Sequence, residues 1–196
     1  MKKIILASSS PRRKEIFKKM GIEFDIIPSS YEEVLINDEF SYEKVENLAL
    51  NKALDVLNKL SPKDFSGYSF ILSADTVVVI NDKILGKPES KDSAVSMLQT
   101  LSGQTHSVIT SICLINLKTQ IKKVLSETSY VEFNVLSENI ILDYINKYKP
   151  FDKAGAYGIQ ELPEGFIKNI EGSFENIVGL CPDVVKKIFN SFSIEL

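Results

Sequence analysis

Residues 8–13 read Ser-Ser-Ser-Pro-Arg-Arg and place hydroxyl and guanidinium groups beside a helix start signal. They follow an apolar run at residues 4–7, which is typical of a buried strand, and they open an amphipathic segment that ends at Met20. Ser10 is a favoured N-cap, and Pro11 suits the first helical position. Helix N-termini and arginine forks both bind anions. The segment therefore predicts a phosphate site, with a merely solvated basic helix start as the alternative.

Two charged residues, Lys52 and Asp75, interrupt apolar patterns. In the helix predicted over residues 42–60, Lys52 follows Val45 by seven positions and so lies beside the apolar stripe. Its stem could cover apolar surface, or its ammonium could reach a phosphate. Asp75 breaks the strand-like run at residues 69–79, and carboxylates are rarely buried without a partner. We expect it to end a core strand as a capping group or, preferably, a site residue with a divalent metal or a bound water as partner.

Two segments rich in small residues could approach a ligand closely. Residues 86–88, Gly-Lys-Pro, would hold Lys87 in place beyond a predicted hairpin, although they also suit an ordinary exposed turn. Residues 152–160 carry two glycines around one tyrosine, which suits a ligand-binding loop or a structural turn. The carboxamide of Gln160 donates and accepts side by side, which complements the N3–H and O4 edge of uracil or thymine. Residues 172–176 form another glycine-led turn, to which composition assigns no chemistry.

The composition limits the class of protein. The chain has 196 residues, 44% hydrophobic and 25% charged, which is ordinary for a globular protein with a real core. Its net charge of −3 argues against general nucleic-acid binding and favours a small anionic ligand for its local basic residues. No apolar run approaches the ~20 residues that span a bilayer. Cys113 and Cys181 form neither a disulfide framework nor a metal cluster, so we expect a reducing cytoplasm.

Other common catalytic patterns are missing from the sequence. It has neither the G-x-x-x-x-G-K-[ST] phosphate loop nor the G-x-G-x-x-G dinucleotide fingerprint. The single histidine, His106, suits a strand start and has no obvious acid or nucleophile partner. A serine hydrolase built on the serines of residues 8–10 would have to use it, and nothing else supports that reading.

Strands and helices alternate along the chain, which predicts an α/β protein with a mixed sheet. Strands are expected at residues 4–7, 24–27, 69–79, 84–85 and 166–170, with three more within residues 106–135. Helices are expected at residues 11–20, 42–60, 91–101, 138–148 and from about residue 183. The length suits one large domain or two tightly joined lobes.

Taken together, these segments resemble the Maf family, also called septum formation inhibitor proteins. The matching pieces are residues 7–13, Glu33, residues 51–53, 73–76, 86–88, 152–160 and 172–180. They occur in family order and span nearly the whole chain, so that together they are highly specific although each is weak alone. Two departures are visible: Ser9 stands where many members have glycine, and Pro182 follows Cys181 where the family usually has Leu-Pro.

The resemblance implies a fold and an activity. The fold is an elongated mixed β-sheet flanked by helices with a deep central cleft, as in inosine triphosphatase-like proteins, formed by one domain over residues 1–196 or by two lobes around the cleft. The activity is hydrolysis of a nucleoside triphosphate to the monophosphate and pyrophosphate with a divalent cation, Mg²⁺ or Mn²⁺. The form of residues 152–160 resembles the dTTP/UTP branch rather than the 7-methyl-GTP branch. The family also suggests a homodimer, with no nucleic acid or membrane as partner.

The resemblance also implies roles for single residues. Asp75 would accept the proton of the attacking water, and Glu33, from an acidic loop, would join Asp75 near the metal. The phosphate path would be lined by Ser8, Arg12, Arg13, Lys52 and Lys87, and substrate choice would rest on Arg12, Thr76 and Gln160. Two alternatives remain: the same chemistry on another base such as 7-methyl-GTP, and a regulator of cell division that binds nucleotide without turnover.

Overall fold

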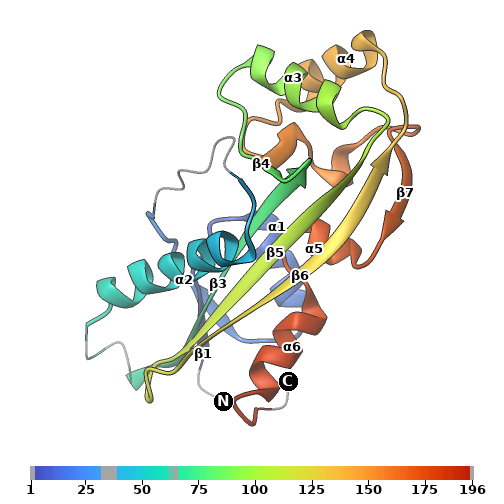
Figure 1. Ribbon diagram of the computed structural model, residues 1–196. Helices are drawn as coiled ribbons and strands as arrows, with labels where there is room; N and C mark the ends of the chain where they lie inside the picture. The colour runs from blue at the N-terminus through green and yellow to red at the C-terminus, as the bar shows by residue number, and fades with distance from the viewer. Residues whose placement is uncertain (1–2, 32–38, 62, 64–65, 195–196) are drawn as a thin grey trace.

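The computed structural model describes residues 3–31, 39–61, 63 and 66–194, and these residues form a mixed β-sheet with helices on both faces (Figure 1). The strands are β1 (Lys3–Leu6), β2 (Phe24–Ile26), β3 (Tyr68–Ile80), β4 (Lys83–Leu85), β5 (Thr105–Asn116), β6 (Lys122–Phe133) and β7 (Ile167–Glu171). The helices are α1 (Pro11–Lys19), α2 (Tyr42–Lys59), α3 (Lys91–Leu101), α4 (Glu138–Tyr148), α5 (Phe174–Val178) and α6 (Pro182–Asn190). The predicted α/β class with a mixed sheet is therefore confirmed.

The strands lie in the order β2-β1-β3-β5-β6-β7, and β4 pairs with β3 as well. The pairs of β1 with β2 and β3 are parallel, whereas the pairs from β3 through β5 and β6 to β7 are antiparallel. The long strands β3, β5 and β6 run the length of the molecule in Figure 1. Strand β3 is therefore the junction between the parallel and antiparallel parts of the sheet.

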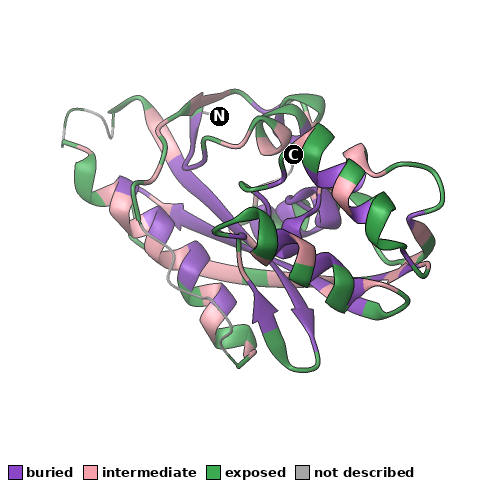
Figure 2. Ribbon diagram, turned by 90° about the horizontal axis from the view of Figure 1, so that it is seen from above, coloured by how far each residue is buried: buried purple, intermediate pink, exposed green. Residues whose placement is uncertain are grey.

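The helices bury apolar side chains on the two faces of this sheet. Helix α2 covers one face of β3 and β5 with a stripe that includes Val45, Ala49 and Val56. Helices α1, α5 and α6 lie on the other face (Figure 1), where Leu72 and Ala74 of β3 belong to the larger core. Figure 2 shows the strands buried between these layers and the exposed residues on the outer helix faces. Alternate residues of β3 thus point to different layers, as the period of two of a strand requires.

The neighbours of β3 change at its middle. Strand β1 pairs with β3 as far as Leu72, and β4 joins the same strand only from Val78 onward. Over residues 73–77, β3 continues to pair with β5. Over this stretch, which contains Asp75 and Thr76, neither β1 nor β4 pairs with the other edge of β3. Because the side chains of Asp75 and Thr76 point to opposite faces of the sheet, a site at this edge can include residues from the helices on both faces.

Serine N-caps define the starts of several helices, including the one predicted at Ser10. The hydroxyl groups of Ser10, Ser41, Ser90 and Ser137 each accept a hydrogen bond from the backbone N–H three residues later. The predicted hairpin turn between β3 and β4 is also present, with Asn81 and Asp82 at φ 50° and 59°. This left-handed pair matches a two-residue hairpin loop, in which asparagine and aspartate tolerate positive φ.

Other predictions for the elements were wrong. Residues 105–133 form the two strands β5 and β6 rather than three, because polar residues within them bond across the sheet instead of ending a strand, as Ser111 and Ser126 do at 2.8 Å. Asp75 neither breaks nor ends β3, which runs unbroken through it. Residues 172–176 lead into a short helix, α5, capped by Ser173.

Two further differences concern the second half of the chain. The last helix begins at Pro182, one residue before the expected start, with this proline in its first turn. The loop expected at residues 151–165 contains two short 3-10 turns, Ala154–Ala156 and Ile159–Glu161. Among the described residues, the helices are too short or too polar to cross a membrane.

Candidate active site

A cavity of about 830 Å³ opens at the middle of β3, where β1 has ended and β4 begins. Its walls come from the loop after β1, the start of α1, helix α2, strands β3 and β4, residues 152–159 and helix α5. It brings together most of the predicted site residues: Ser8, Arg12, Arg13, Lys52, Asp75, Thr76 and Lys87. Residues spread over the first half of the sequence therefore meet in one place.

Two predicted site residues are not placed there. Gln160 is exposed and does not belong to the described lining of the cavity, although its neighbour Ile159 does. Its role in base recognition therefore stays a prediction. Glu33, predicted as a metal ligand, lies outside the described residues.

Lys52 and Asp75 form a buried ion pair at the floor of the cavity. The ammonium of Lys52 donates to Oδ1 of Asp75, and the two side chains are only 11% and 3% exposed. One turn before Lys52, the carbonyl of Ala49 accepts a hydrogen bond from Ser73, which fastens α2 to β3 beside the pair. Each charge offsets the desolvation cost of the other, so removing one would leave an uncompensated buried charge. The ion pair also explains why a carboxylate can sit inside an unbroken core strand.

Arg13 lies on the opposite face of β3 from Asp75. Its Nε donates to the carbonyl of Gly179 at 2.8 Å, and its Nη2 donates to Oγ1 of Thr76 at 3.0 Å. A longer contact of 3.5 Å joins Nη1 to the hydroxyl of Ser8, which itself accepts from the backbone of Ser10. The planar guanidinium is thus oriented by several elements at once, as bidentate recognition of a phosphate requires.

Residues 152–160 pack against the segment that carries Lys87. The backbone N–H of Gly155 donates to the carbonyl of Gly86 at 3.0 Å. Gly155 has φ 66°, and a Cβ there would meet three side-chain atoms of Val78 at 3.1 Å. Glycine is therefore required for both the conformation and the close approach. The two small-residue segments noted in the sequence form one wall of the cavity.

Lys153 is a cavity residue that sequence reasoning missed. Its buried ammonium pairs with Asp152 at 2.8 Å and with Glu161 at 3.3 Å, and its stem passes so close to Gly158 that a Cβ there would lie 2.8 Å from it. Burial alone would raise the pKa of Asp152, but the hydrogen bond from Lys153 and the charges of Lys153 and Arg12 lower it overall. In the sequence, the only signal was a lysine among small residues.

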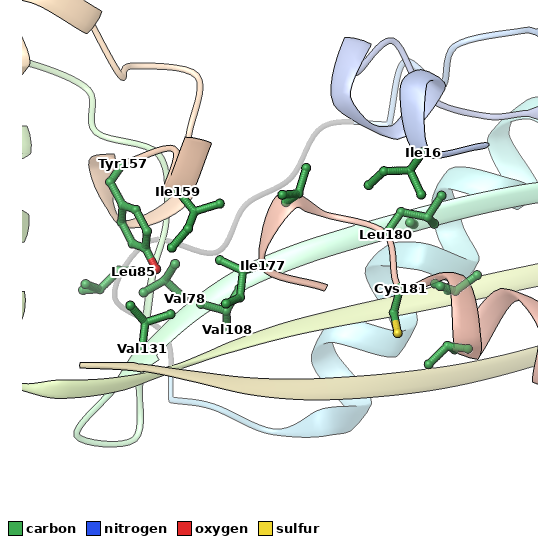
Figure 3. Close-up of a cluster of buried hydrophobic side chains, with 14 of the residues drawn as sticks. Ile16, Val78, Leu85, Val108, Val131, Tyr157, Ile159, Ile177, Leu180 and Cys181 are labelled. Atoms are coloured by element: carbon green, nitrogen blue, oxygen red, sulfur yellow. The ribbon is translucent and has the colours of Figure 1, made fainter. Parts of the chain in front are cut away.

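Apolar side chains also line the cavity. They include Val78, Leu85, Val108, Ala154, Tyr157, Ile159, Ile177 and Val178. Figure 3 shows several of them converging from β3, β4, β5, the 3-10 turns and α5. The cavity therefore combines cationic side chains that suit phosphates with apolar side chains that suit a nucleobase.

His106 supports this wall and is not a catalytic base. Its Nε2 lies 2.7 Å from the hydroxyl of Tyr157, and its Nδ1 has no hydrogen-bond partner among the described residues. Burial lowers the pKa of His106 to about 4 and raises that of Tyr157. Because His106 is not part of the described lining, the serine-hydrolase alternative lacks its base in this arrangement.

The described residues contain no group of three His, Cys, Asp or Glu side chains that could hold a metal ion by themselves. Asp75, which pairs with Lys52, is one of the carboxylates that line the cavity, together with Glu89 and Asp152. A metal held at Asp75 would therefore need further ligands besides these described side chains.

Comparisons with known proteins agree with the geometry. The family model described as Maf-like protein matches residues 3–192. A protein of Caldicellulosiruptor saccharolyticus named dTTP/UTP pyrophosphatase is 44% identical over 92% of this chain and 89% of its own length. One of the same name from Clostridium perfringens is 41% identical over 99% of both chains. A human protein named probable bifunctional dTTP/UTP pyrophosphatase/methyltransferase protein is 37% identical over 94% of this chain and 32% of its own length.

The buried histidine predicts a specific loss of stability in acid. The folded-state pKa of about 4 lies below the ordinary value of 6.5, so the unfolded chain takes up the proton first as the pH falls. The stabilisation is complete above pH 6.5 and is lost between there and about pH 4, which corresponds to about 3 kcal/mol. In urea unfolding, the wild type should lose about 3 kcal/mol more stability over this pH range than His106→Gln, whose amide can still bond Tyr157. Parallel pH profiles for the two proteins would contradict the assignment.

Proposed function

The chain belongs to the Maf family, and from this membership and the cavity we propose that it is a nucleoside triphosphate pyrophosphatase acting on dTTP and UTP. Its products would be the nucleoside monophosphate and pyrophosphate, and its role would be to remove nucleotides from the pool. The observation that carries this proposal is a buried aspartate, Asp75, held by Lys52 inside a cavity lined by both cationic and apolar side chains.

The cationic side chains of the cavity would neutralise the negative charge of the triphosphate, which is the main obstacle to the reaction. A nucleoside triphosphate carries about four negative charges, which repel an attacking water and must be neutralised first. The cationic side chains among the described lining residues are Arg12, Arg13, Lys52, Lys87 and Lys153. Fixed charges of this kind stabilise both the bound polyphosphate and the charge that develops on the leaving pyrophosphate. They would also align the anhydride bond between the α and β phosphates for attack.

Asp75 is suited to take the proton from the attacking water. Its position is fixed by the unbroken strand β3 and by the ion pair with Lys52, so it costs little to keep it oriented. A positioned general base typically accelerates such a step ~10²–10⁴-fold. The proton would pass from the water to the Asp75 carboxylate as the oxygen bonds to the α-phosphorus and the bond to the β-phosphate oxygen breaks.

We also propose a divalent cation, Mg²⁺ or Mn²⁺, for this site. Magnesium is commonly held by one or two protein carboxylates together with substrate phosphates, which fits a cavity whose described centre offers Asp75 rather than a cluster of acids. When bound, such an ion would neutralise phosphate charge. Glu33 would be the second carboxylate, as the family resemblance implies.

A panel of nucleoside triphosphates tests the activity and the substrate class together. With dTTP, UTP, CTP, ATP, GTP and 7-methyl-GTP, we expect pyrophosphate release chiefly from dTTP and UTP, and only when Mg²⁺ or Mn²⁺ is present. Preferred turnover of 7-methyl-GTP would contradict the pyrimidine assignment. Tight binding of dTTP without product under any metal condition would favour a nucleotide sensor instead.

Replacement of the proposed base tests the role of Asp75. Asp75→Asn keeps the shape but removes the charge, so turnover of dTTP should fall ~10²–10⁴-fold while nucleotide binding stays measurable by calorimetry. Asp82→Asn makes the same change on the exposed turn of the adjacent hairpin and should leave turnover unaltered. Normal turnover in Asp75→Asn would exclude Asp75 as the base that accepts the proton of the attacking water.

Gln160→Glu tests whether this residue reads the base. A carboxylate can accept from N3–H but cannot donate to O4, so kcat/KM for UTP and dTTP should fall relative to the other triphosphates if Gln160 turns toward the base. An unchanged preference would exclude Gln160 as the residue that reads the base and leave base selection to the side chains that line the cavity.

A further inference from the structure

A chain of hydrogen bonds runs from Arg13 along one face of the sheet, across strands β3 and β5, to helix α5. Nη2 of Arg13 donates to Oγ1 of Thr76 at 3.0 Å, and this hydroxyl lies 2.9 Å from Oγ1 of Thr110 on the neighbouring strand β5. Oγ1 of Thr110 in turn donates to the backbone carbonyl of Asn176 at 2.9 Å. Thr76 and Thr110 are directly opposite each other in the register of β3 and β5. The hydrogen bonds therefore pass from β3 to β5 at one position along the strands.

The direction of each bond in this chain is determined by chemistry. The carbonyl of Asn176 can only accept, so Thr110 must spend its single hydroxyl proton there. Thr110 therefore accepts from Thr76, whose own proton is committed to that bond. Oγ1 of Thr76 is then an acceptor for Arg13, whose guanidinium can only donate. Every donor thus points from the cavity toward α5, and none opposes its neighbour.

Helix α5 is a firm anchor for this chain. Asn176 is fully buried, and its side-chain amide donates to the carbonyl of Val108 and to the hydroxyl of Ser129, both at 3.0 Å. Ser129 also donates to the carbonyl of Ser173, the N-cap of α5. Gly179, the C-cap of the same helix, accepts from Nε of Arg13. The guanidinium is therefore connected to the same short helix twice, once directly through Gly179 and once through Thr76 and Thr110.

We propose that Thr110 and Asn176 are positioning residues for Arg13: they hold Thr76 as a hydrogen-bond acceptor and so lock the plane of the guanidinium that meets the polyphosphate. This proposal deepens the proposed function and rests on it for the identity of the ligand. Neither residue belongs to the described cavity lining, so each would act only through its neighbours.

Thr110→Val removes the hydroxyl with little change of shape. The Asn176 carbonyl keeps a second donor, the backbone N–H of Gly179 at 3.0 Å, so the substitution does not strand a buried acceptor and the protein should fold. Thr76 loses the acceptor for its proton and can turn, which releases one bond of the Arg13 fork. A hydrogen bond to a charged group is worth roughly tenfold in affinity or more, so we expect about a tenfold loss. Thr110→Ser keeps the hydroxyl and is the matched control.

The test measures binding of α,β-imido-dUTP, which is not cleaved between the α and β phosphates, by calorimetry. Thr110→Val should weaken binding about tenfold, and Thr110→Ser should stay within about twofold of the wild type. In an Arg13→Lys background, which has no fork to orient, Thr110→Val should change the affinity by less than about twofold. Thr110→Ala serves in the same cycle if the valine variant does not fold.

Two results would overturn the positioning role. One is wild-type affinity in Thr110→Val, and the other is an equal loss with and without Arg13, which would indicate a general structural effect. Because the measurement is of binding, it does not depend on turnover. A wild type that binds the analogue but fails to cleave dTTP would refute the proposed function. In that case the positioning role would still be supported if Thr110→Val weakens binding when residue 13 is arginine but not when it is lysine.

Discussion

The buried ion pair between Lys52 and Asp75 is the interaction on which the site depends. It joins the only charged group on the buried stripe of α2 to a carboxylate in the core strand β3, and each charge makes the burial of the other tolerable. The strand can therefore continue through Asp75 instead of ending there. As a result, the carboxylate is presented by two rigid elements rather than by a loop, which is how a catalytic group is held in a productive position.

The second constraint is the change of partners along β3. Because β1 leaves the strand at Leu72 and β4 joins it at Val78, the stretch between them borders the cavity on one side while β5 supports it on the other. Asp75 then faces the α2 layer, and Thr76 faces the layer of α1 and α5. The proposed base and the oriented Arg13 are thus neighbours across a single strand, and a polyphosphate in the cavity can meet both.

Local chemistry made much of this predictable. Ser10 and Pro11 located the start of the first helix, and the seven-residue spacing from Val45 placed Lys52 beside the buried stripe. What the sequence could not show depends on contacts between distant residues. Asp75 was expected to break or end its strand. The sequence could not show that Lys52, on another element, pairs with it and allows the strand to continue. Thr110 gave no signal, and Asn176 stood in a turn to which composition assigned no chemistry, because their roles arise from the register of β3 against β5 and from the docking of α5. Lys153 is buried and pairs with Asp152 and Glu161, and Gln160 is exposed within a short 3-10 turn.

We propose that a water directed by Asp75 attacks the α-phosphorus of a triphosphate held by the surrounding cations. Hydrolysis of dTTP in ¹⁸O-labelled water, followed by mass spectrometry of both products, shows which phosphorus the water attacks. We expect one labelled oxygen in the nucleoside monophosphate and none in the pyrophosphate. Label in the pyrophosphate would mean attack on the β-phosphorus, and labelled inorganic phosphate would mean attack on the γ-phosphorus; either result would refute attack at the α-phosphorus.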